Sequence, residues 1–202
     1  MTKTIEVDTI TALDQNLDIE ADVILSTLDL GTLSGSGLSS GTESLFQLES
    51  MDTFDNDDHE WDNKISTCSN SFIQSSSFLG GPCKTSDTEV SKNFDNLPIH
   101  SHIRVKANYH MFDEWNGEYG YMKVNDEMVW TKIAESPKHT EKSVNICGSK
   151  ASDPAFNMLV DVIVPHHGES VKVSFGSSLK TDSCKASYGV DNVMLFVKDG
   201  QN

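Results

Sequence analysis

The chain has 202 residues with 15 basic and 31 acidic side chains, a formal net charge of −16. This acidity argues against a nucleic-acid partner, because nucleic-acid-binding surfaces place Lys and Arg against phosphates. No stretch approaches the roughly 18 to 20 consecutive apolar residues of a membrane helix, so no membrane span is expected.

Residues 1–45 form an acidic arm that ends in a connector. Residues 1–63 carry 15 Asp and Glu and a single basic residue, whereas the rest of the chain is nearly balanced. Residues 31–44 are rich in Gly, Ser and Thr and predict a flexible connector. Before it, apolar residues alternate with acids, which is the pattern of a half-buried strand: Leu17, Ile19, Ala21 and Val23. Such a strand can pair with its own chain, pair with a neighbouring subunit or stay disordered.

Residues 46–202 predict an all-β domain, a β-sandwich of short strands separated by turn residues. Asn125 and Asp126 tolerate positive φ and are expected to join two strands as a hairpin. The nearly continuous apolar run 158–164 predicts a central strand. Strands are expected at residues 102–115, 119–124, 128–133, 158–164, 171–175 and 190–197.

The four cysteines are Cys68, Cys83, Cys147 and Cys184, and none of them forms a C-x-x-C pair. In a β-rich chain this predicts two disulfides and therefore an oxidising compartment, secreted or at the cell surface. Buried free thiols are the alternative. Three pairings are possible from the residues alone.

Asp191 is the most informative acid. In a regular strand it shares a face with Val193, Leu195 and Val197, so its carboxylate is expected to point inward. A buried carboxylate needs a partner or a metal ion. Acids in residues 52–60 and 113–118 supply further oxygens, and calcium takes six to eight of them. We therefore expect a calcium ion to be shared by these segments, with a merely solvated acidic run as the alternative.

Other motifs give weaker signals. Gly37–Gly41 fits G-x-S-x-G, but it lies in the connector and lacks the strand and helix of a nucleophile elbow. His100 with His102 could form a metal-binding pair, although exposed histidines at a strand start are the simpler interpretation. The same interpretation applies to His166 and His167, which follow a proline. Four aromatic residues could stack on sugars or lie in the core: Trp115, Tyr119, Tyr121 and Trp130.

A series of segments resembles a known module. Phe78–Gly81, Val90–Phe94, Leu97–Val105, Phe112–Glu118 and Tyr188–Val193 occur in the order found in a jelly-roll module of secreted and surface proteins of ciliates and other protists. The ending also resembles MAM and galactose-binding-like jelly rolls. The resemblance covers about residues 50–198 and leaves the arm outside.

The resemblance implies a jelly-roll fold with a structural cation. It carries the ligand role to Asp55 and Asp191, with Asp52 competing with Asp55 and with Asp113 and Glu118 as added candidates. It also implies Cys68–Cys83 and Cys147–Cys184 as the disulfide pairs.

The sequence thus predicts a non-enzymatic, calcium-stabilised extracellular module. We expect its N-terminal strand to join a neighbouring copy, giving a homo-oligomer or a filament in a fibre or surface coat. The alternative is a calcium-dependent, lectin-like module that binds glycans. A jelly-roll glycosidase using Asp113, Glu114 and Glu118 is a distant third.

Overall fold

The computed structural model describes residues 46–56, 59–68, 76–134 and 145–199, which form strands, turns and loops. All of them lie in the second of the two units into which the chain divides, Glu43–Asn202. The predicted strand of Leu17, Ile19, Ala21 and Val23 lies outside the described residues. Within the described part no helix could cross a membrane.

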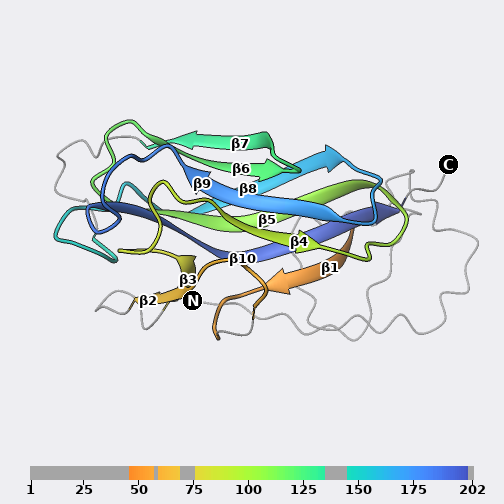
Figure 1. Ribbon diagram of the computed structural model, residues 1–202, viewed down its shortest axis with the longest axis horizontal. Coiled ribbons are helices and arrows are strands. Elements are labelled where there is room, and N and C mark those ends of the chain that lie inside the picture. Colours follow the sequence, from red (N-terminus) through yellow and green to blue (C-terminus); the bar gives the residue numbers. More distant parts are fainter. Residues whose placement is uncertain (1–45, 57–58, 69–75, 135–144, 200–202) are drawn as a thin grey trace, which may run out of the picture. The chain divides into compact units, whose positions relative to one another are not determined.

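The described residues form a β-sandwich of two antiparallel sheets, which confirms the predicted all-β fold class (Figure 1). Sheet A has the order β2-β3-β10-β5-β8, and β1 pairs with a further part of β10. Its strands are β1 (Phe46–Asp52), β2 (Ile65–Cys68), β3 (Ser76–Gly80), β5 (His100–Asp113), β8 (Ala155–Pro165) and β10 (Ala186–Asp199). Sheet B has the order β4-β9-β6-β7, with β4 (Val90–Phe94), β6 (Tyr119–Val124), β7 (Glu127–Ile133) and β9 (Val171–Ser177).

Two local predictions are confirmed. Strands β6 and β7 form a hairpin whose turn residues Asn125 and Asp126 have φ of 49° and 66°, as a type I′ turn requires. Strand β5 alternates as expected, with one row of side chains buried in the core between the sheets. That row consists of Ile103, Val105, Ala107, Tyr109 and Met111.

The apolar run 158–164 is not a central strand. It belongs to β8, which lies at the edge of sheet A and pairs only with β5 among the described strands. Its outward-facing Leu159 and Ile163 are 64% and 51% exposed. The prediction of a central strand was wrong because an apolar run indicates strand formation but not the number of neighbouring strands.

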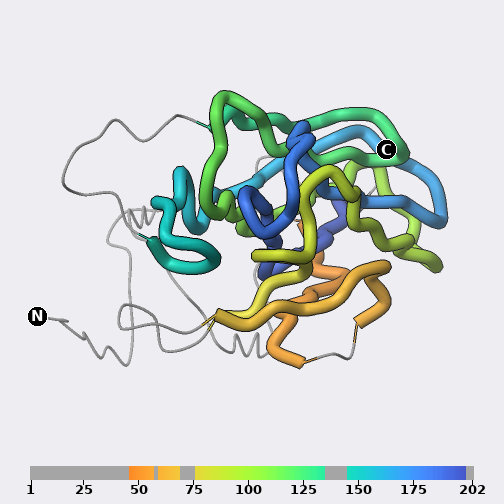
Figure 2. The backbone as a smooth tube through the Cα atoms, turned by 60° about the vertical axis from the view of Figure 1, so that its left-hand side comes forward, coloured from red at the N-terminus to blue at the C-terminus, as the bar shows by residue number. Residues whose placement is uncertain are grey.

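Figure 2 shows β1 and β2, in orange, on the side of the sandwich opposite to β6 and β7, in green and turquoise.

The disulfide pairing also differs from the expectation. Cys68 bonds to Cys147 and Cys83 bonds to Cys184. The implied pairs Cys68–Cys83 and Cys147–Cys184 were wrong, because each cysteine lies beside a partner that is distant in the sequence. Two disulfides are compatible with an oxidising, extracellular location.

Candidate functional site

The acids expected to bind calcium have different neighbours in the structure. Asp52, at the end of β1, accepts a hydrogen bond from Trp61 Nε1 at 3.0 Å. Its carboxylate also lies 3.1 Å from Nζ of Lys92, which is buried and belongs to β4 of the opposite sheet. Asp55 is exposed in the segment after β1. Asp52 is therefore neutralised by a lysine that links the two sheets.

Asp113 ends β5 and holds a nearby loop. Its Oδ1 accepts a hydrogen bond from the Ser149 backbone N–H at 2.6 Å. Burial raises the pKa of Asp113, and the hydrogen bonds from Ser149 offset only part of this effect. Glu118 accepts a hydrogen bond from the backbone N–H of Asn116 in its own turn. The carboxylates of Asp113 and Glu118 thus both accept hydrogen bonds from backbone N–H groups.

Asp191 is buried, but on the face of β10 opposite to the expected one. Asp191 lies opposite Asn108, whereas Leu195 lies opposite Val105, so these two residues face opposite sides of sheet A. The register shifts between Asp191 and Met194, and Asn192 has a φ of 49°. This β-bulge adds a residue and reverses the alternation.

The neighbour of Asp191 is a histidine. His110 Nε2 lies 3.4 Å from Asp191 Oδ2, and the imidazole is fully buried. The other ring nitrogen, Nδ1, accepts a hydrogen bond from the Asn157 backbone N–H. Since Nδ1 is an acceptor, Nε2 carries the proton and faces the carboxylate. His110 was not predicted from the sequence, because it belongs to β5 and lies far from Asp191 in the chain.

The predicted ligands do not gather around one ion. On β10, Asp113 lies opposite Ala186 and Asp52 lies opposite Val193. At about 3.3 Å per residue these positions are roughly 20 Å apart, whereas calcium ligands lie about 2.3–2.6 Å from the ion. Within residues 46–56, 59–68, 76–134 and 145–199, no group of three or more His, Cys, Asp or Glu is arranged to hold a metal. Calcium binding therefore stays a prediction, and the described residues do not supply a group of ligands for it.

The four aromatic residues considered for stacking on sugars lie in two different environments. Trp115 is buried and donates from Nε1 to backbone carbonyls of Phe112 and Ser187. Trp130 packs against Tyr109 with ring centroids 5.4 Å apart. Tyr119 and Tyr121 lie on the outer face of sheet B, where the Tyr121 hydroxyl donates to Glu89. Burial and this acceptor raise the pKa of Tyr121 to about 12. Two aromatics therefore belong to the core, and two face outward.

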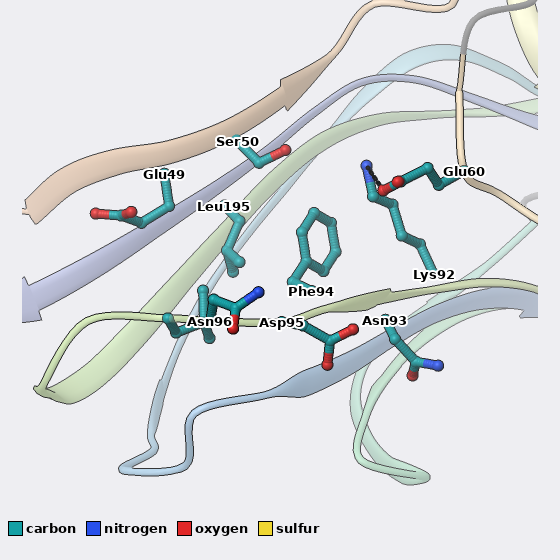
Figure 3. Close-up of a pocket in the computed structure, with 10 residues that line it drawn as sticks. Glu49, Ser50, Glu60, Lys92, Asn93, Phe94, Asp95, Asn96 and Leu195 are labelled. Atoms are coloured by element: carbon teal, nitrogen blue, oxygen red, sulfur yellow. Dashed lines mark ion pairs between the residues drawn. The ribbon is translucent and has the colours of Figure 1, made fainter.

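A cavity of about 370 Å³ opens at the edge of the sandwich where β1 of sheet A faces β4 of sheet B (Figure 3). Its volume falls within the range of about 300 to 1,000 Å³ that is typical of small-ligand sites. It is lined by Glu49, Ser50, Glu60, Lys92, Asn93, Phe94, Asp95, Asn96, Leu97 and Leu195. Phe94, Leu97 and Leu195 are buried and supply the apolar part, whereas the other residues supply carboxylates, amides, a hydroxyl and an amine.

Backbone irregularities place two of these side chains. The register of β1 against β10 shifts between Leu48 and Ser50, so Glu49 is a bulge residue without a partner opposite it. Bulges commonly turn a side chain toward a functional site. Asn96, in the turn after β4, has a φ of 59°, a conformation that Asn tolerates better than most residues. Both irregularities leave a polar side chain at the cavity.

The cavity carries an excess of negative charge. Three carboxylates line it, and its single cation, Lys92, is shared between Asp52 and Glu60, at 3.1 and 3.7 Å. Glu49 Oε1 is buried and has no hydrogen-bond partner among the described residues. A buried acceptor without a donor is costly, so this oxygen favours a ligand that donates a hydrogen bond.

Sequence reasoning missed this cavity. Asp95 and Asn96 before Leu97-Pro98 are turn residues and could have marked one wall. Nothing in the sequence marked Glu49, because its position depends on pairing between β1 and the distant β10.

No protein-family model matches the sequence, and no curated protein matches it. Several solved structures are similar in part. PorU from Porphyromonas gingivalis matches at 8% identity with a TM-score of 0.44, over 60% of this chain and only 11% of PorU. The CBM22-1 xylan-binding domain of Paenibacillus barcinonensis Xyn10C matches at 10% identity and a TM-score of 0.43, over 77% of this chain and 97% of that domain. A family 35 carbohydrate-binding module from an environmental isolate matches at 9% identity and a TM-score of 0.35, over 79% and 96% of the two chains.

Proposed function

We propose that this chain is a non-enzymatic glycan-binding module that works outside the cytosol and holds a sugar in the cavity between β1 and β4. The observation that carries the proposal is the buried, unpartnered Oε1 of Glu49 at a polar cavity with an apolar part. Sugars present hydroxyl groups that both donate and accept, together with apolar C–H faces. Carboxylates and amides complement the hydroxyls, and Phe94 and Leu195 complement the C–H faces.

The charge of the cavity favours one class of glycan. Glu49, Glu60 and Asp95 outnumber Lys92, whose charge Asp52 already compensates. Anionic sugars such as uronates would meet like charges, which disfavours binding. We therefore propose neutral or amino-bearing sugars as ligands.

Calorimetric titration of the full chain with neutral, amino-bearing and uronate-containing oligosaccharides tests this proposal. We expect binding of the first two classes and a loss of about 10-fold or more in affinity for Glu49→Gln, because the charged acceptor is removed. Glu127→Gln removes the same charge from the exposed start of β7 and should leave the affinity unchanged. No binding by any oligosaccharide, or equal affinity of the two variants, contradicts the proposal.

A second candidate function is the self-assembling structural module predicted from the sequence. The observation in its favour is the edge of β8 that no other described strand pairs with, in an 11-residue strand with exposed Leu159 and Ile163. Its one charged residue, Asp161, forms a salt bridge with Arg104 at 2.6 Å. The carboxylate is therefore already paired and does not oppose the addition of another strand. Such edges accept strands from other chains. We rank the self-assembling module second because no feature of this edge identifies a particular partner.

A further inference from the structure

The two disulfides differ in exposure although they line the same cavity of about 510 Å³. Cys83 and Cys184, which are bonded to each other, are both exposed. In the other pair, Cys147 is only 4% exposed and Cys68 is half-buried. Thiol–disulfide exchange requires a thiolate to reach a sulfur atom, so exposed disulfides are the labile ones. A thiol that enters the cavity therefore reaches Cys83–Cys184 more readily than Cys68–Cys147.

The backbone conformation of Cys83 also favours opening of its disulfide. Cys83 is the third residue of a turn in which the Lys84 N–H donates to the Gly81 carbonyl at 3.1 Å. The second residue of this turn is Pro82, and Cys83 has a φ of 58°. Turns of this pattern normally have Gly or Asn at the third position, because other side chains are strained at positive φ. The disulfide thus includes a strained residue, and strained disulfides open more readily than relaxed ones.

Hydrogen bonds keep the two cysteines adjacent independently of the cross-link. The Cys83 N–H donates to the Ser183 carbonyl at 3.0 Å. The Cys184 N–H donates to Oδ1 of Asp182 at 2.8 Å, and the Lys185 N–H donates to the Asp182 carbonyl at 2.9 Å. Opening of the disulfide breaks none of these bonds. The two sulfur atoms therefore stay within reach of each other, and the disulfide can form again.

The charge of this cavity favours an anionic thiol. Among the described residues that line it, Lys84 is the only charged one. Two acids adjoin the lining, and each accepts a hydrogen bond from the backbone: Asp113 from Ser149 and Asp182 from Cys184. The cavity therefore presents a positive charge in a chain whose net charge is −16, and it attracts anions.

The position of Lys84 also distinguishes the two sulfur atoms of the disulfide. Lys84 follows Cys83 directly and lines the cavity. Lys185 follows Cys184 but is not among the lining residues. A nearby cation stabilises a thiolate, so Cys83 is the better leaving group and Cys184 is the sulfur that is attacked.

We propose that Cys83–Cys184 is a site of covalent modification by small anionic thiols. The incoming thiol loses its proton to solvent, and its sulfur attacks Sγ of Cys184. A new S–S bond joins the thiol to Cys184 while the Cys83–Cys184 bond breaks. Sγ of Cys83 keeps the electron pair of the broken bond and leaves as a thiolate, and Cys68–Cys147 stays intact. This inference does not depend on glycan binding.

Peptide mapping of the full chain without reduction tests the site. The chain is incubated at neutral pH with the anionic thiol 2-mercaptoethanesulfonate, and free thiols are then blocked with N-ethylmaleimide. We expect the added thiol on Cys184, the maleimide on Cys83 and an intact Cys68–Cys147 cross-link. An adduct on Cys68 or Cys147, an adduct on Cys83 in place of Cys184, or no adduct on any cysteine overturns the proposal.

The preference for an anion is tested with 2-mercaptoethanol, which has the same two-carbon chain without the charge. We expect the sulfonate to react about 5-fold faster per thiolate, the factor given by one nearby unit charge in water, and this ratio should fall at high salt. Lys84→Gln should remove the preference. Lys132→Gln removes the same charge from the exposed side of β7 and should keep it. Equal rates for the two thiols, or an unchanged ratio in Lys84→Gln, overturns the anionic preference.

Discussion

Asp153 organises the loop that follows residue 145 by accepting three backbone hydrogen bonds. Its Oδ1 accepts from Asp113, and its Oδ2 accepts from Ile146 and Cys147. Burial raises the pKa of Asp153, which these hydrogen bonds oppose only in part. At the residue scale, several acids of this chain serve as acceptors for N–H groups that strand pairing leaves unsatisfied.

Gly148 tests how tightly this loop is packed. It has a φ of 93°, and a Cβ there would overlap Oδ2 of Asp113. Gly117 has a φ of 88° and open space around it. A substitution there therefore measures the cost of the backbone conformation alone, without a steric overlap. We expect Gly117→Ala to lower the free energy of unfolding by about 1–2 kcal/mol and Gly148→Ala to lower it by about 1–3 kcal/mol more. Urea denaturation measures both, and equal losses would show that Asp113 moves aside freely.

At the scale of elements, the alternation of apolar and polar residues predicted the regular strands correctly. It predicted the wrong side-chain direction where a β-bulge interrupts a strand. The turn of β6–β7 and the buried row of β5 followed from turn chemistry and period two. The bulge at Asn192 turned Asp191 to the other face, and the bulge at Glu49 supplied the cavity with its carboxylate. A bulge depends on pairing with a strand elsewhere in the chain, so local sequence does not reveal it. The same reason explains why β8 was predicted to be a central strand. Its apolar pattern is visible in the sequence, but its position at the edge of the described sheet is not.

The edge of β8, which is unpaired as far as the described strands go, gives a prediction about association. We expect Leu159→Glu with Ile163→Glu to reduce any concentration-dependent association of the full chain, because edge charges oppose strand addition. Met128→Glu with Ile133→Glu is the matched control on β7, where the two residues are 45% and 63% exposed. Sedimentation velocity over a range of concentrations measures the effect. A wild-type chain that stays monomeric, or equal behaviour of the two variants, contradicts assembly through β8.

At the scale of the whole molecule, both disulfides join distant parts of the chain. Cys68–Cys147 spans 79 residues and Cys83–Cys184 spans 101. All four cysteines line one cavity of about 510 Å³ beside β2 and the turn after β3. Cross-links that close long loops restrict the unfolded chain most in the chain-entropy account.

Removing one cross-link should therefore be costly. We expect Cys83→Ser with Cys184→Ser to lower the free energy of unfolding by about 2–4 kcal/mol, measured by urea denaturation. Peptide mapping without reduction should show Cys68 joined to Cys147 in the wild type and in this variant. Recovery of Cys68 joined to Cys83 in the wild type would contradict the pairing.

The interlaced pairing has a consequence for proteolysis. A single cleavage of the backbone anywhere between Cys68 and Cys184 leaves the two fragments covalently attached, since at least one cross-link always spans the break. A chain cleaved once in this range would then stay in one piece, and its fragments would separate only after a reductant is added.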